Sequence, residues 1–106
     1  MRDYVNEWLA KQWSRPIGKD ESRWICPRLE CKSGLSLSIQ ASQYHYCVPR
    51  SDTGPWIAVE VGYPSRKLRT LRDHADDLKG TVYGYVPIDK VNRIIARNGG
   101  PKEKDA

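Results

Sequence analysis

The sequence predicts a small α+β domain, in which an antiparallel sheet of three to four strands packs against two to three helices. Three observations favour this class. Apolar residues recur at helical spacing near both ends of the chain. In the middle they alternate with polar residues, and glycine or proline separates the segments. The length of 106 residues fits a single domain over 1–106, with a frayed tail at 102–106.

The first predicted element is an amphipathic helix over residues 3–13. Its apolar residues recur at helical spacing and are Val5, Trp8, Leu9 and Trp13. Asp3 stands at the N-cap position, where a carboxylate accepts a backbone N–H. Pro16 ends this helix, because proline lacks the N–H that a helix needs.

A hairpin of two strands is predicted over residues 24–30 and 35–41. Pro27 contributes no N–H, so the first strand belongs at an edge of the sheet or carries a bulge. The turn is supplied by Lys32-Ser33-Gly34. In the second strand, polar residues alternate with four apolar residues that predict a buried face: Leu35, Leu37, Ile39 and Ala41.

Residues 56–63 predict a further strand, with one face formed by Ile57, Val59 and Val61. The stretch over 65–79 is open between two interpretations. Its apolar residues fit a helical stripe, namely Leu68, Leu71, Ala75 and Leu78. Its paired aspartates and the following glycine fit a loop equally well.

Residues 81–86 are rich in β-forming residues and predict the last strand. Pro87 then opens the final helix, since proline suits the first turn. Its apolar face would consist of Val91, Ile94 and Ile95. Gly99-Gly100 would end it.

Eighteen Lys and Arg residues against thirteen Asp and Glu residues give a formal net charge of +5. Such a surplus favours anionic partners, although it also serves solubility. It argues against a mimic of DNA, which has to be acidic. No apolar run approaches the roughly 20 residues that span a bilayer, and the N-terminus lacks an apolar signal segment. We therefore expect a cytoplasmic protein with no membrane partner, whose three cysteines are reduced.

The densest group of polar and aromatic residues lies at 43–50. In an extended chain His45 and Cys47 project to the same side. An arginine there can grip a carboxylate or phosphate, and tyrosines can stack or donate a hydroxyl. We predict a binding site at one end of the sheet, formed by His45, Tyr46, Arg50, Trp56 and Glu60. A packed sheet end, in which Tyr44 and Tyr46 pack and Cys47 is a buried apolar group, explains the same residues.

A zinc site is a second hypothesis for the same region. Four competent ligands occur with the spacing C-x4-C and then H-x-C: Cys26, Cys31, His45 and Cys47. The usual C-x2-C spacing is missing, and residues five apart on a regular strand face opposite ways. The sequence therefore favours three isolated thiols and no cofactor over zinc.

A third feature is a basic stretch that consists of Arg66, Lys67, Arg69 and Arg72. It could follow a phosphate backbone. It could also be a solvated face, in which Asp73, Asp76 and Asp77 balance the positive charge. The sequence favours the solvated face, because mixed charge on an exposed helix is common.

No complete catalytic pattern is visible. The chain has no Ser-His-Asp order, phosphate-binding loop, dinucleotide fingerprint or evident pair of carboxylates. A nucleophilic Cys47 would need a correctly oriented base, and His45 two residues away along a strand does not supply one. The sequence therefore predicts a protein that is not an enzyme.

From about Arg23 onward the chain resembles a family of small, mostly uncharacterised proteins encoded by tailed bacteriophages. The matching strings are ECKSGLSLSIQAS at 30–42, HYCVPR at 45–50, GPW at 54–56, VEVGYPS at 59–65, GTVYGYVP at 80–87 and GG at 99–100. Where relatives carry Asp before the turn glycine, this chain has Ser33. The resemblance implies a phage origin and expression in a bacterial cytoplasm, and it implies no activity.

Three functional hypotheses follow. The first is a non-enzymatic bacteriophage accessory protein that binds a host protein, with inhibition of host defence as one form of this. The second is a binder of an anionic ligand, either a nucleotide signal or a nucleic acid. The third is a small zinc-stabilised module.

Overall fold

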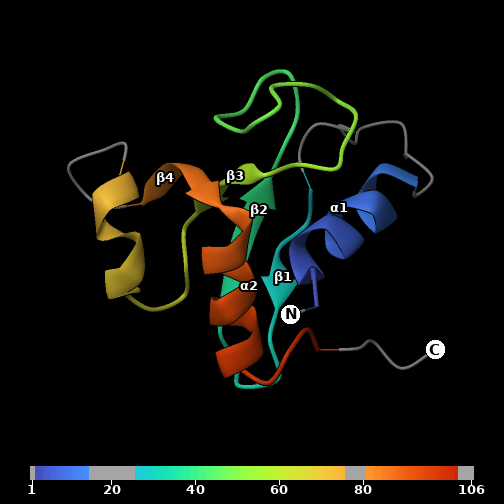
Figure 1. Ribbon diagram of the computed structural model, residues 1–106. Helices are drawn as coiled ribbons and strands as arrows, with labels where there is room; N and C mark the ends of the chain where they lie inside the picture. Colours follow the sequence, from blue (N-terminus) through green and yellow to red (C-terminus); the bar gives the residue numbers. More distant parts are fainter. Residues whose placement is uncertain (1, 15–25, 76–80, 103–106) are drawn as a thin grey trace.

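The computed structural model describes residues 2–14, 26–75 and 81–102. In chain order its elements are α1 (Tyr4–Ser14), β1 (Leu29–Glu30), β2 (Ser36–Gln40), β3 (Ala58–Gly62), the 3-10 helix η1 (Arg69–His74), β4 (Val82–Pro87) and α2 (Ile88–Arg97). The strands form one antiparallel sheet in the order β1-β2-β3-β4. Both α-helices cover the same face of this sheet, and η1 lies beside β4 (Figure 1). The predicted α+β class is therefore confirmed.

The core lies between the sheet and the two α-helices. The alternation over 35–41 is confirmed, because Leu35, Leu37, Ile39 and Ala41 are all buried. They join residues from the other elements in one apolar cluster, including Val59, Val61, Val5, Leu9, Val91 and Ile95. Burial of each large aliphatic side chain contributes about 1.5–3 kcal/mol, so this face stabilises the fold.

Two predictions about strands are wrong in detail. The first strand is limited to Leu29–Glu30, because the N–H of Cys26 bonds to the side chain of Gln40 instead of to a neighbouring strand. Residues 24 and 25 lie outside the described residues. Ile57 was predicted to share a face with Val59 and Val61, but it is 69% exposed while they are buried, because β3 begins only at Ala58.

The stretch left open over 65–79 contains a six-residue 3-10 helix, η1, which makes about two turns. Within η1 the side chain of Leu71 is buried, and Leu68, which precedes η1, is half-buried. The helix ends where Ala75 pairs with Tyr83 of β4. Leu78 lies outside the described residues.

The predicted start of the first helix and the predicted end of the last helix are confirmed. α2 begins at Ile88, one residue after the predicted Pro87, which is the last residue of β4. The end predicted at Pro16 lies outside the described residues. Oδ1 of Asp3 accepts the N–H of Asn6 at 3.1 Å, as an N-cap side chain does. At the end of α2, the N–H groups of Gly99 and Gly100 bond to the carbonyls of Ala96 and Ile95. Both glycines have positive φ, which only glycine adopts readily.

The C-terminal segment covers the outer edge of β1. Cys31 pairs with Pro101, and the N–H of Lys102 donates to the carbonyl of Glu30 at 2.7 Å. A strand at the edge of a sheet has backbone groups that another chain could pair with, and here the C-terminal segment occupies some of those of β1. The rest of the predicted tail, 103–106, lies outside the described residues.

A buried amide, that of Asn92, joins the two α-helices. Its Oδ1 accepts the N–H of Val5 at 3.0 Å, and its Nδ2 donates to Asp3 at 3.2 Å. Asn6 exchanges two hydrogen bonds of 2.8 Å with the backbone of Trp56, which attaches α1 to the chain before β3. Burial alone would raise the pKa of Asp3, but hydrogen bonds from Asn6 and Asn92 together lower it.

A bulge interrupts the pairing of β3 with β4. Val61 pairs with Tyr83 and Val59 pairs with Val86, so one residue of β3 opposes two residues of β4. The extra residue belongs to the Gly84-Tyr85 pair, and Tyr85 has a φ of 51°. Its N–H bonds to the loop between β2 and β3 instead of to β3.

Within the described part of the chain, neither α-helix has the length and apolar character that crossing a membrane requires.

Substitution of Asn92 by alanine is expected to lower the free energy of unfolding by about 2 kcal/mol, because it leaves a buried N–H of α1 without its acceptor. The matched control is Arg93→Ala on the exposed side of α2, which should change stability by less than about 0.5 kcal/mol. Urea denaturation measures both. Equal stabilities of the two variants would contradict the role of Asn92.

Candidate functional site

The loop between β2 and β3 is held against the sheet at several backbone positions, at one end of the sheet (Figure 1). Val48 forms a bridge with Ala58, and its carbonyl also accepts the N–H of Ile57 at 2.7 Å. Two residues before Val48, the N–H of Tyr46 donates to Oε2 of Glu60 at 2.9 Å. The carbonyl of Tyr46 accepts the N–H of Tyr85 at 3.0 Å. The bulge in β4 thus provides a bond that holds the loop.

Gly84 allows this close approach. A Cβ at this position would lie 3.2 Å from the Cβ of Tyr46, closer than ordinary van der Waals contact. A glycine inside a strand often marks such an approach of another segment. The residue type at 84 therefore permits Tyr46 to lie over the sheet.

Tyr46, Tyr85 and Arg50 form what we call the tyrosine–arginine surface. The two rings have centroids 5.7 Å apart and are tilted by 31°. The guanidinium carbon of Arg50 lies 5.7 Å from the centroid of the Tyr46 ring, a cation–π distance. All three side chains are exposed, with Tyr85 at 48%.

Two exposed aliphatic residues lie next to this surface. Tyr46 and Val48 flank the buried Cys47 and are themselves exposed. Ile57 is bonded through its N–H to Val48. Large apolar groups in solvent are ordinary when single, but neighbouring ones indicate an interaction surface.

His45 and Glu60 support the loop from beneath. Nδ1 of His45 lies 2.6 Å from Oγ of the buried Ser42, which also accepts the N–H of Tyr44. Burial lowers the pKa of His45, which the carboxylate of Glu60 partly opposes. His45 therefore holds the loop through its bond with Ser42, and Glu60 holds it through its bond with the N–H of Tyr46.

Four of the five predicted binding residues come together here: His45, Tyr46, Arg50 and Glu60. The fifth, Trp56, is only 4% exposed, and its indole Nε1 donates to the carbonyl of Ser51. It therefore presents no ring to a ligand, because its large apolar area is more stable in the core. Sequence reasoning missed Tyr85, although the glycine before it could have indicated a bulge.

Two potential nucleophiles close to His45 in the chain, Ser42 and Cys47, are buried. The hydroxyl of Ser42 lies beside a histidine, but Ser42 is fully buried. Cys47 is 1% exposed, and its Sγ donates to the carbonyls of Ser42 and Pro49. Burial raises the pKa of the Cys47 thiol, which keeps it protonated.

The four predicted zinc ligands occupy separate surroundings. Cys47 is bonded within the loop, and Cys31 lies at the β1 edge beside Pro101. Over the described ranges, which include all four ligands, no three His, Cys, Asp or Glu side chains gather to hold a metal ion. The geometry therefore lends no support to a zinc site.

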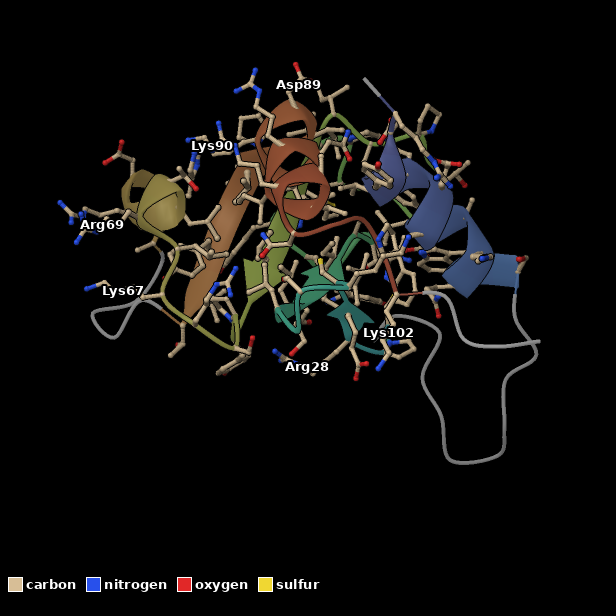
Figure 2. All side chains as sticks on the ribbon, turned by 90° about the horizontal axis from the view of Figure 1, so that it is seen from below. Arg28, Lys67, Arg69, Asp89, Lys90 and Lys102 are labelled. Carbon is tan, nitrogen blue, oxygen red and sulfur yellow. The ribbon has the colours of Figure 1, made fainter. Side chains whose placement is uncertain are left out.

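The predicted basic residues lie on η1 and on the chain before it. Arg66 donates to Oδ1 of Asn98 at the end of α2. The remaining three, Lys67, Arg69 and Arg72, are exposed. Figure 2 shows Lys67 and Arg69 pointing away from the body of the molecule.

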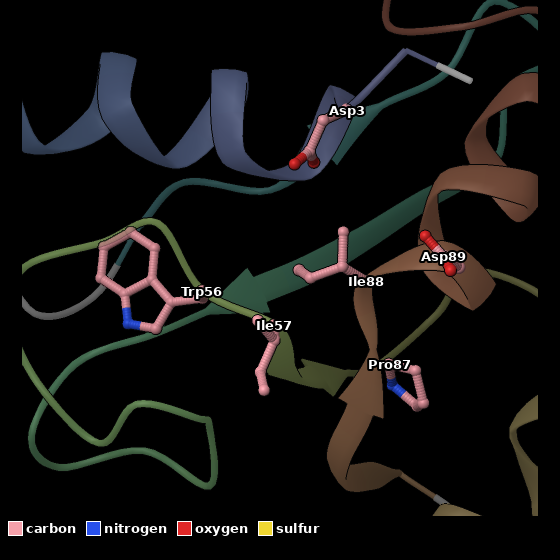
Figure 3. Close-up of a pocket in the computed structure, with 6 residues that line it drawn as sticks. All are labelled: Asp3, Trp56, Ile57, Pro87, Ile88 and Asp89. Carbon is pink, nitrogen blue, oxygen red and sulfur yellow. The ribbon is translucent and has the colours of Figure 1, made fainter.

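A hollow of about 300 Å³ lies near Ile57, where the N-termini of α1 and α2 approach each other (Figure 3). Its lining consists of Asp3, Trp56, Ile57, Pro87, Ile88 and Asp89. The Asp3 carboxylate is already used as the cap of α1. The hollow therefore combines four apolar residues with two aspartates, of which Asp89 is exposed.

The free energy of unfolding should fall as the pH drops below 6.5, the ordinary pKa of histidine. Because the folded-state pKa of His45 is lowered, the unfolded chain binds more protons in this range, and stability rises with pH. His45→Asn keeps a hydrogen-bond acceptor for Ser42 but does not titrate, so it should flatten the dependence. Urea denaturation at several pH values measures the free energy of unfolding of both proteins. Equal slopes of this free energy against pH for the native protein and His45→Asn would contradict the role of His45.

The three thiols should resist a thiol reagent in the folded protein and all react after unfolding in urea, because all are buried. As a control, Thr53→Cys places a thiol on an exposed part of the loop, where it should react at once. Rapid reaction of any native cysteine in the folded protein would show that its burial is incomplete.

No family model, no curated protein and no solved structure matches this chain.

Proposed function

We propose that the chain is a non-enzymatic binding protein, and that it docks another protein on the tyrosine–arginine surface together with Val48 and Ile57. One observation carries this proposal. Exposed aromatic, aliphatic and guanidinium groups lie together on a loop whose backbone is bonded to the sheet. Tyrosine and arginine are the residue types that most often dominate binding energy between proteins.

The fixed backbone strengthens the proposal. A loop that becomes ordered only on binding loses conformational entropy at that moment, which weakens the complex. Here the carbonyl of Tyr46, the N–H of Tyr46 and both polar groups of Val48 already have partners on the sheet. The surface is therefore arranged before a partner arrives.

The hollow beside Ile57 extends the surface. It is open to solvent and lined by both apolar residues and aspartates, so a side chain of the partner can enter it. The carboxylate of Asp89 at its edge favours a basic side chain there. The hollow is open to solvent and only two of its six lining residues are polar, which argues against a small-molecule site.

The non-enzymatic part of the proposal is supported by the burial of Ser42, whose hydroxyl contacts His45, and of Cys47. A nucleophile without access to substrate cannot react. The resemblance to bacteriophage proteins adds a bacterial host protein as the partner, and inhibition of host defence as one consequence of binding. The host partner and the inhibition of defence rest on this resemblance and not on the geometry of the surface.

Tyr85→Asn tests the proposal, because it removes one ring while asparagine tolerates the positive φ. Tyr63→Asn is the matched control: Tyr63 is 61% exposed, has a φ of 47° and follows the other end of β3. Tagged protein is used to capture partners from bacterial lysate, and the affinity of any stoichiometric partner is then measured with purified components.

The partner's affinity should fall roughly 30-fold for Tyr85→Asn and stay unchanged for Tyr63→Asn. Absence of a stoichiometric partner, or equal affinity for both variants, would refute the proposal.

A further inference from the structure

We infer that η1 and α2 form a second surface, which binds the phosphate backbone of duplex nucleic acid. This surface is separate from the tyrosine–arginine surface and does not depend on it. It joins two rows of cations from different parts of the chain. One row lies on residues 66–74 and the other on the exposed side of α2.

The row on α2 follows from helical spacing. Its members are Lys90, Arg93 and Arg97, which are three and four residues apart and therefore share one side of the helix. The opposite side of α2 carries Val91, Ile94 and Ile95, which are buried in the core. The cations are thus held on the outside of a helix that the core fixes.

Contacts at both ends hold the two rows beside each other. Nζ of Lys90 lies 3.1 Å from Nε2 of His74, the last residue of η1. Arg66 donates to Asn98 at the other end of α2. Figure 2 shows Lys90 on the side of α2 that faces η1, with Lys67 and Arg69 pointing outward beyond η1.

These two segments hold the whole formal surplus of positive charge. Residues 66–74 and α2 contain seven Lys and Arg residues and two Asp residues, which leaves five positive charges. The complete chain also has a formal charge of +5, so the remainder is formally neutral. Asp76 and Asp77, which follow η1 in the chain, lie outside the described residues. Solubility alone needs no such segregation, whereas recognition of a polyanion does.

The side chains also favour duplex nucleic acid over other anions. A membrane-binding helix inserts apolar residues into lipid, but the large apolar residues of α2 face the core. Single-stranded nucleic acid is usually held by stacking on aromatic rings, and neither row contains Trp, Tyr or Phe. Arginine and lysine on a rigid helix and turn match the regularly spaced phosphates of a duplex.

The test measures binding of a fluorescent DNA duplex as a function of salt. The test variant is Arg69→Gln/Arg93→Gln, which removes one cation from each row. The control is Lys11→Gln/Lys102→Gln, which removes two exposed cations outside both proposed surfaces and lowers the net charge equally. Circular dichroism checks that both variants are folded.

Native protein and the control should bind duplexes of unrelated sequence equally. The test variant should bind roughly tenfold more weakly at low salt, and the slope of log K against log salt should become shallower by about two. Tyr85→Asn should leave duplex binding unchanged, which separates this inference from the proposed function.

Three results would overturn the inference. The first is absence of duplex binding by the native protein at low salt. The second is an equal loss in the test variant and the control, which would reduce the effect to net charge. The third is binding to anionic phospholipid vesicles or to the separated single strand in preference to the duplex.

Discussion

The carboxylate of Glu60 is the group on which the arrangement of the exposed surface depends. It lies in the central strand β3, half-buried, and accepts the N–H of Tyr46. The bulge in β4 then offers the N–H of Tyr85 to the carbonyl of the same residue. Without these two bonds the backbone groups of Tyr46 would need water, and the ring would have no fixed position over Gly84. A local irregularity of the sheet therefore determines where the loop lies.

The molecule separates two kinds of chemistry on its surface. Aromatic and aliphatic groups gather on the loop between β2 and β3, around Tyr46 and Tyr85. Positive charge gathers on α2, which covers the sheet, and on η1, which lies beside β4. The first kind of surface gains energy by excluding water, and the second by releasing counterions. Binding at the first should respond weakly to salt, and binding at the second strongly.

The candidate site could be predicted in part. His45, Tyr46, Arg50 and Glu60 were expected together because polar and aromatic residues crowd one short stretch and one strand. Trp56 was misassigned, since its type alone could not show whether its ring faces solvent or the core. Tyr85 was assigned to a regular strand, because the residues of a bulge have no side-chain pattern of their own apart from the neighbouring glycine.

The sequence by itself determined the order of the α-helices and strands, the buried face of β2, the start of α1 and the end of α2. These depend on near neighbours in the chain: a period of two or 3.6, an N-cap at Asp3 and the glycines after α2. Tertiary structure alone decided which surfaces formed. Contacts such as Glu60 with Tyr46 and His74 with Lys90 join residues that are distant in the chain, and local periodicity carries no information about them.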